Sequence, residues 1–191
     1  MIKLKLDVGT GRVTPARFVQ SPNCDPRPRS VEIDVLVIHA ISLPPRCYGG
    51  NYIEQYFTNQ LAIEADPYFP EIQQLKVSAH FLIKRSGELL QFVPTHLRAW
   101  HAGSSNFEGR EQVNDFSLGI ELEGCDEEAF ESVQYDVLSN LCRCLMHCYP
   151  LIRPDHIVGH SDVSPGRKTD PGPCFDWRRL QRKIEKTTLT G

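Results

Sequence analysis

Three residues that lie far apart in the chain, His39, His160 and Asp170, are of the types that bind catalytic zinc. Such zinc usually has three protein ligands, drawn from His, Asp, Glu and Cys, together with an exchangeable water. The ion would polarise a carbonyl group and activate water for hydrolysis. Spacing alone is a weak indication, because a single histidine is more often a structural residue than a ligand.

The loop 159–173 holds two of these residues and reads GHSDVSPGRKTDPGP. It brings a histidine, Lys168 and an aspartate within about a dozen residues, while three prolines restrict its backbone. A rigid polar loop of this kind can preorganise a site. The alternative, that GRKTD is a solvated, charged turn, is equally compatible with the sequence.

Two carboxylates lie on a predicted strand at 116–124, where apolar and other residues alternate strictly. Glu121 and Glu123 share the face opposite Phe116, Leu118 and Ile120. Either glutamate could move a proton at a zinc centre. Periodicity cannot choose between them, and both could also be solvated carboxylates.

Short apolar runs predict the elements that position these side chains. VLVIHA at 35–40 indicates a central strand that delivers His39 to a loop, and HIVGH at 156–160 indicates a strand that ends at His160. A hairpin is predicted from 77–84 and 89–94 around the turn RSGE. Helices are predicted over 51–62, 133–149 and 176–187.

The order of these elements predicts an α/β fold, a central mixed sheet flanked by helices, in a single domain spanning 1–191.

In the helix over 133–149 the periodic apolar positions are Val133, Val137, Leu141, Cys144 and Cys148, flanked by Leu138, Cys142 and Leu145. The first thirty residues end in SPNCDPRPRS and are expected to form an irregular arm that lies over the domain.

Composition excludes several classes of partner. With 21 basic and 24 acidic residues and a net charge of -3, the chain has no electrostatic footprint for nucleic acid or an anionic membrane surface. It has neither an apolar run long enough to span a membrane nor a signal sequence, so a cytoplasmic location is expected. Seven cysteines without a CxxC pair favour reduced thiols, and CRCLMHC at 142–148 is better explained by small buried residues than by a metal site.

Seven motifs, in one order across roughly residues 18–180, resemble the zinc amidases of the N-acetylmuramoyl-L-alanine amidase family, and among these the cytoplasmic anhydro-muropeptide amidases. They are VLVIHAISLPP, GGNYIEQYFTNQL, DPYFPEI, LKVSAHFLIKRSGELLQFVP, RAWHAGSSNFEGRE, NDFSLGIELEG and GHSDVSPGRKTDPGPCFDW. The resemblance implies the fold of phage lysozyme-type amidases and peptidoglycan recognition proteins. It also implies cleavage between 1,6-anhydro-N-acetylmuramic acid and L-alanine, for peptidoglycan recycling.

Carried over position by position, the family's zinc ligands fall on His39, His160 and Asp170. Its general base falls on Glu121, and its transition-state-stabilising lysine falls on Lys168. The cofactor expected from the resemblance is Zn²⁺, and the expected partner is a small anhydro-muropeptide bound by a monomer.

Substrate contacts are predicted at four further positions. Trp100 and His101 in RAWHAG could stack on a sugar, although a buried tryptophan is as often part of the core. Lys76 and Arg110 could bind carboxylates of the stem peptide, although exposed basic residues are usually solvated. Ala40 stands where relatives tend to have asparagine, which would alter specificity rather than the reaction.

Two other functions are compatible with this architecture. A binding module of the peptidoglycan recognition type would keep the groove without catalysis, but such modules often lack zinc ligands that are present here. A zinc hydrolase that cleaves another bond, such as one within the peptide, is the other alternative.

Overall fold

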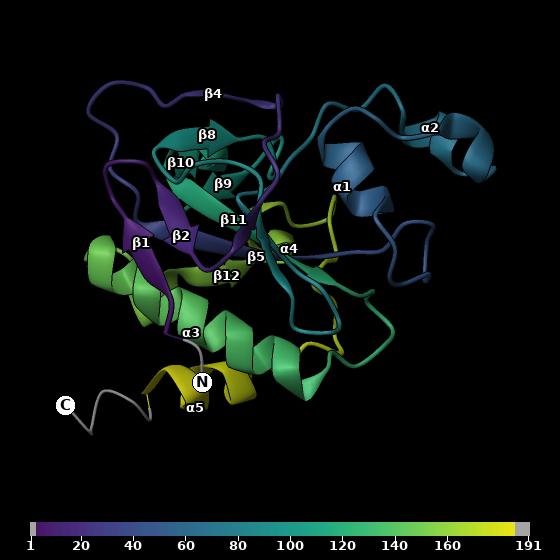
Figure 1. Cartoon of the computed structure of the whole chain (residues 1–191). Helices are drawn as coiled ribbons and strands as arrows, with labels where there is room; N and C mark the ends of the chain where they lie inside the picture. The colour runs from purple at the N-terminus through teal and green to yellow at the C-terminus, as the bar shows by residue number, and fades with distance from the viewer. Residues whose placement is uncertain (1–2, 186–191) are drawn as a thin grey trace.

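A six-stranded mixed sheet carries the fold in the computed structural model, which describes residues 3–185 (Figure 1). Its strand order is β12-β5-β11-β6-β7-β3. In chain order these strands are β3 (Arg17–Phe18), β5 (Val35–Ile41), β6 (Phe81–Ile83), β7 (Leu89–Gln91), β11 (Ser117–Glu123) and β12 (Ile157–Gly159). Strands β12, β5, β11 and β6 are parallel, whereas β7 runs antiparallel to β6. The predicted mixed sheet and its hairpin are therefore confirmed.

The two central strands are buried on both faces. In β5, Leu36 and Ile38 pack in one hydrophobic cluster, while Val35 and Val37 pack in another on the opposite side. A continuous apolar run of this kind is what a parallel strand covered on both faces requires. All seven residues of β11 are likewise buried.

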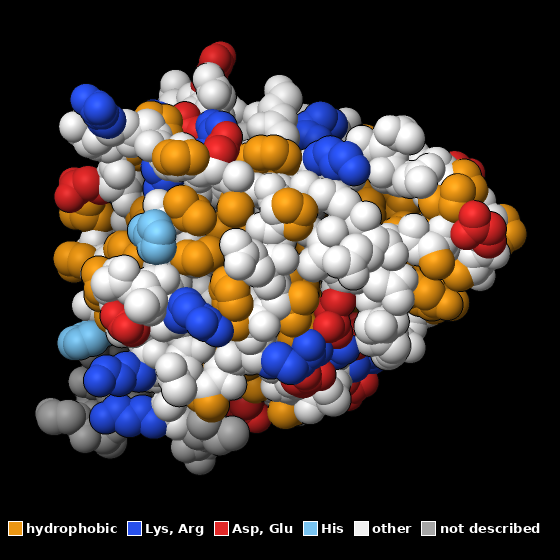
Figure 2. Space-filling view, turned by 45° about the horizontal axis from the view of Figure 1, so that its top comes forward, with side chains coloured by type: hydrophobic (Ala, Val, Ile, Leu, Met, Phe, Trp, Pro, Cys, Tyr) orange, Lys and Arg blue, Asp and Glu red, His pale blue; other side chains and the backbone are white. Residues whose placement is uncertain are grey.

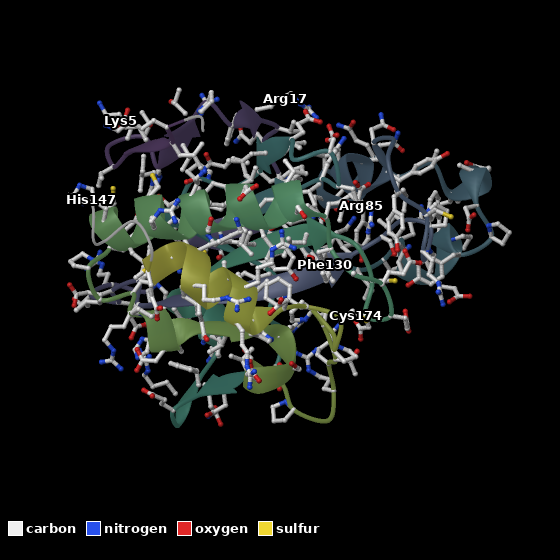
Figure 3. All side chains as sticks on the ribbon, turned by 90° about the horizontal axis from the view of Figure 1, so that it is seen from below. Lys5, Arg17, Arg85, Phe130, His147 and Cys174 are labelled. Atoms are coloured by element: carbon white, nitrogen blue, oxygen red, sulfur yellow. The ribbon has the colours of Figure 1, made fainter. Side chains whose placement is uncertain are left out.

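Helices cover the sheet unequally. One face is covered by α3 (Ser132–Cys148) and α5 (Trp177–Glu185), which Figures 1 and 3 show side by side. The opposite face carries a smaller cluster with α1 (Tyr52–Phe57) and α2 (Phe69–Ile72). The helix predicted over 51–62 is therefore shorter than expected, and residues 186–187 of the last predicted helix lie outside the described residues.

The buried face of α3 differs from the one predicted. Val133, expected to be buried, is 39% exposed, and Val137, Cys144 and Cys148 are only partly buried. The core-facing residues are Gln134, Tyr135, Leu138, Ser139, Leu141, Cys142 and Leu145. The apolar stripe was assigned too far to one side because Gln134 and Ser139 are buried polar residues, and Gln134 donates hydrogen bonds to backbone carbonyls of Ile83 and Glu123.

The prediction of an irregular arm over 1–30 is wrong for the part that the structure describes. This segment forms a hairpin of β1 (Lys5–Asp7) and β2 (Arg12–Thr14), supplies β3 to the main sheet, and pairs β4 (Cys24–Pro26) with β8 (Leu97–Ala99). Leu6 and Val13 are buried in the main core. The strands are too short to produce a recognisable alternation, and tertiary packing stabilises them.

The remaining elements are short. They are α4 (His160–Val163), the strand pair β9 (Asn106–Phe107) and β10 (Arg110–Glu111), and single 3₁₀ turns at Ile63–Ala65, Val113–Asp115 and Pro154–His156. No helix in residues 3–185 is both long and apolar enough to cross a membrane. On the face in Figure 2, basic and acidic side chains are interspersed, and apolar side chains lie between them.

Candidate active site

The ends of two neighbouring parallel strands bring His39 and His160 together. His39 is close to the carboxyl end of β5, and His160 directly follows β12 as the first residue of α4. Because β12 pairs in parallel with β5, both strands end at one edge of the sheet. Asp170 reaches the same edge on the loop after α4, where its carbonyl accepts a hydrogen bond from Ser161 N at 3.0 Å.

The ligand atoms of these three residues form a small triangle. His39 Nδ1 and His160 Nδ1 are 3.0 Å apart, and Asp170 Oδ2 is 3.0 Å from the first and 3.1 Å from the second. A four-coordinate zinc ion with bonds of about 2.0–2.1 Å separates its ligands by about 3.3 Å. The donor types and their convergence therefore fit zinc.

Burial and mutual contact determine the protonation of His39 and Asp170. Burial lowers the pKa of His39 to about 4, although the hydrogen bond to Asp170 opposes this shift. Burial opposes ionisation of Asp170, but hydrogen bonds from the two imidazoles outweigh it and hold the pKa of this carboxyl below its usual range. At neutral pH His39 is therefore neutral and Asp170 is ionised, which are the forms that bind a metal.

The second nitrogen of each imidazole also has a partner. His160 Nε2 lies 3.1 Å from the carbonyl oxygen of Ala102, and His39 Nε2 lies 3.0 Å from His101 Nδ1. Arg167 donates to the same Ala102 carbonyl and, at 2.8 Å, to the carbonyl of Ser104. This arginine, which the sequence analysis did not single out, ties the loop 159–173 to the segment after β8.

The two glutamates of β11 have different surroundings. Glu123 accepts hydrogen bonds from the backbone N–H groups of Gly49 at 2.6 Å and Arg85 at 2.9 Å. Glu121 lies beside His39 in the sheet register and lines the pocket over the triangle. Among residues 3–185 its buried Oε2 has no hydrogen-bond partner. The expectation that the pair could be solvated is therefore wrong for both.

Burial raises the pKa of Glu121 well above its ordinary range, and the negative charge of Asp170 adds to this shift. Lys168 opposes it, because its positive charge favours the carboxylate. Lys168 is an exposed residue that lines the same pocket. All five residues predicted to carry the chemistry thus border one space.

That space is a pocket of about 360 Å³ with a polar floor and an apolar wall. The floor contains the triangle, His101, Glu121 and Lys168. The wall comes largely from the region around α1 and α2 and includes Leu43, Tyr56, Phe57, Tyr68, Ile72, Leu75 and Val77. The only signal of this wall in the sequence is the weak helical pattern of 51–62.

The four predicted substrate contacts differ in their relation to the pocket. His101 lines it, and Lys76 is an exposed residue between the lining residues Leu75 and Val77. Trp100 is half-buried and does not line the pocket. Its side chain instead forms a hydrogen bond with Asp25. This bond lowers the pKa of the Asp25 carboxyl, in addition to the larger effect of the hydrogen bonds from Arg98.

Arg110 lies at the other end of the sheet. Its guanidinium pairs with Asp34 at 2.8 Å, directly before β5 begins, and stacks over the ring of Phe116, directly before β11. The pocket is at the carboxyl ends of these strands. The prediction that Arg110 contacts the substrate is therefore not supported by its position.

Comparison with known proteins adds a family assignment to this geometry. The family described as N-acetylmuramoyl-L-alanine amidase matches residues 29–173. Over 185 residues the chain is 51% identical to the 1,6-anhydro-N-acetylmuramyl-L-alanine amidase AmpD of Haemophilus influenzae, covering 97% of this chain and 100% of that protein.

Solved structures agree with the sequence comparison. A crystal structure of a selenomethionine AmpD derivative matches with a TM-score of 0.91 at 47% identity, covering 96% of this chain and 99% of that one. The E. coli amidase AmiD, solved with the substrate anhydro-N-acetylmuramic acid-L-Ala-D-gamma-Glu-L-Lys, matches with a TM-score of 0.59 at 28% identity. That match covers 95% of this chain and 65% of the AmiD chain.

Proposed function

The chain belongs to the N-acetylmuramoyl-L-alanine amidase family, and from that premise we propose that it hydrolyses the amide between 1,6-anhydro-N-acetylmuramic acid and L-alanine with the help of zinc. The observation that carries the proposal is the triangle of His39, His160 and Asp170 on the floor of a pocket that also holds Glu121 and Lys168. The 51% identity to a relative named for this reaction supports the choice of bond.

His39, His160 and Asp170 would hold the metal through two Nδ1 atoms and one carboxylate oxygen. When bound, zinc supplies Lewis acidity that polarises the amide carbonyl and makes water a better nucleophile near neutral pH. Burial keeps His39 neutral and its hydrogen-bonded neighbours keep Asp170 ionised, so these two ligands bind the metal without a large change in their own protonation.

Glu121 is the proposed general base. Its buried carboxylate has an oxygen without a hydrogen-bond partner in residues 3–185, so it can accept a proton from the attacking water. The raised pKa then favours a protonated Glu121, which can pass the proton to the departing nitrogen of alanine. Such a cycle is typically worth about 10²–10⁴-fold in rate.

Lys168 is proposed to stabilise the developing oxyanion. It is the basic side chain that lines the pocket beside Glu121 and Asp170. A positive charge next to a developing negative charge lowers the barrier most where water is excluded. Substrate would contribute to that exclusion by filling the pocket.

The substrate is proposed to be an anhydro-muropeptide, with its peptide along the apolar wall and Lys76 near its carboxylates. The relative AmiD, which was solved with such a molecule, supports this class. Ala40 lines the pocket directly after His39, and its methyl group cannot make the polar contact that an asparagine would make. We propose that Ala40 alters substrate specificity rather than the reaction catalysed.

A role in peptidoglycan recycling, a cytoplasmic location and a monomeric state stay predictions.

Product mass after incubation with an anhydro-muropeptide tests the proposal, using zinc-loaded protein and protein stripped of metal. We expect intact stem peptide to be released only by the zinc-loaded form. Unaltered substrate in both samples would favour a binding module. Cleavage within the peptide would favour a zinc hydrolase of another bond.

A further inference from the structure

A chain of three buried polar side chains leads away from the triangle of ligand atoms. His39 Nε2 lies 3.0 Å from His101 Nδ1, and His101 Nε2 lies 3.2 Å from Ser117 Oγ. Their residues are 1%, 9% and 0% exposed. Water therefore has little access to these groups, and each polar atom depends on its protein partner.

Only one arrangement of protons satisfies this chain when Nδ1 of His39 is a ligand. A neutral imidazole has a single N–H, so His39 must carry its proton on Nε2 and donate it to His101 Nδ1. His101 then has its own proton on Nε2 and donates it to the Ser117 hydroxyl oxygen. His101 is thereby the acceptor that matches the metal-binding tautomer of His39, and the Ser117 hydroxyl accepts from His101 in turn.

The position of the His101 ring is itself built into the sheet. A Cβ atom at Gly119 would lie 2.5–2.7 Å from ring atoms of His101, so only glycine leaves room for the imidazole against β11. Asn114 Oδ1 accepts hydrogen bonds from the backbone N–H groups of His101 at 3.2 Å and Ala102 at 2.8 Å. Arg27 donates to the carbonyl of Ser117 at 2.8 Å, next to the far end of the chain.

The same short segment also orients the other histidine of the triangle. His160 Nε2 lies 3.1 Å from the carbonyl of Ala102, so its proton is directed away from Nδ1 as well. Two adjacent residues, His101 and Ala102, thus provide one side-chain acceptor and one backbone acceptor. Both imidazoles turn Nδ1 toward Asp170 as a result.

We propose that His101 is a positioning residue, which fixes the tautomer and ring orientation of His39 for metal binding, rather than a contact for the sugar. The proposal rests on the proposed function, because it takes His39 as a ligand. Partners of this kind typically change metal affinity by about 10–100-fold when they are removed.

The test measures zinc affinity by competition with a chromophoric chelator, together with thermal unfolding of the metal-free protein. In H101F an aromatic ring still fills the space against Gly119 but lacks an acceptor for His39 Nε2. We expect zinc affinity to fall by about 10–100-fold. In H101N the side-chain oxygen can occupy the place of Nδ1, so most of the affinity should return. The matched control H147F changes an exposed histidine on α3 and should bind zinc as the wild type does.

A zinc affinity of H101F equal to that of the wild type would overturn the proposal. If KM of H101F is raised at that unchanged zinc affinity, His101 is a substrate contact instead. If H101F does not fold, a comparison of H101N with H101Q tests the proposal instead. The glutamine oxygen reaches toward the place of Nε2 rather than that of Nδ1, so H101Q should bind zinc more weakly than H101N. Equal zinc affinities of these two variants would overturn the proposal. Wild-type protein that takes up no zinc would instead contradict the proposed function itself.

Discussion

The same substitution at two positions of β11, E121Q and E123Q, separates a chemical from a structural role. The two glutamates are two residues apart and are 9% and 2% exposed. Each change removes a negative charge and nearly preserves the shape of the side chain. Only the surroundings differ, so the two variants control for each other.

E121Q removes the carboxylate that would accept a proton from water. We expect kcat to fall by about 10²–10⁴-fold, which corresponds to about 3–5 kcal/mol in the barrier. The metal-free variant should be at least as stable as the wild type, because Glu121 is a buried carboxyl with an oxygen unpaired in residues 3–185. Zinc content should stay at one ion per chain.

E123Q replaces an acceptor that two backbone N–H groups share, those of Gly49 and Arg85. One of them would then face the NH₂ group of glutamine, and a buried donor without an acceptor costs about 1–3 kcal/mol. For a chain of this size the melting temperature should fall by roughly 2–12 °C. The variant should keep most of its kcat, because its side chain does not line the pocket.

The assay compares kcat on an anhydro-muropeptide, zinc content and thermal unfolding for both variants and the wild type. Near-normal turnover by zinc-loaded E121Q would refute the assignment of Glu121 as the base. A loss of turnover in E123Q as large as in E121Q, at an unchanged melting temperature, would refute the division of roles between the two glutamates.

Three further predictions concern stability. Burial raises the pKa of Glu121 in the folded protein, so the metal-free wild type should lose stability relative to E121Q as pH rises from about 4.3 toward that raised pKa. Melting temperatures of the wild type and E121Q that change with pH in the same way would contradict this prediction. R27M removes the donor to the backbone carbonyls of Asn114, Asp115 and Ser117, and it should lower the free energy of unfolding by about 2–4 kcal/mol in a denaturant titration. Arg12 is exposed, so the control R12M should have little effect in the same titration. L138A should cost about 2–5 kcal/mol and V133A less than about 1 kcal/mol, and equal losses would argue against the observed face of α3.

The strands that deliver the histidines are predictable because the evidence for them is local. VLVIHA is an uninterrupted apolar run, and a strand buried on both faces needs one. HIVGH is shorter but leads to His160 in the same way. The residue types of the triangle are also visible in the chain, although spacing alone did not join them and the family resemblance was needed.

Alternation in β11 predicts that Glu121 and Glu123 share a face, but it carries no information about what meets that face. Gly49 and Arg85, which bind Glu123, come from two other loops. The error on α3 has a similar cause, because hydropathy gives no weight to two buried polar residues that are satisfied in the fold. Gln134 donates to carbonyls of Ile83 and Glu123, and Ser139 donates to the carbonyl of Asp136 within the same helix. The sequence also does not tell which end of the sheet Arg110 reaches, and its position beside Asp34 does not support the predicted substrate contact.

The sequence by itself determined the sheet-forming runs, the ligand types and the strand face of the glutamates, because these depend on neighbouring residues and a repeating backbone geometry. Only the tertiary structure decided which of these residues meet. His39 lies 121 positions from His160 and 62 from His101, and the contacts between them arise when parallel strands end at one edge. The pocket, the burial of Glu121 beside it and the orientation of both imidazoles follow from that convergence.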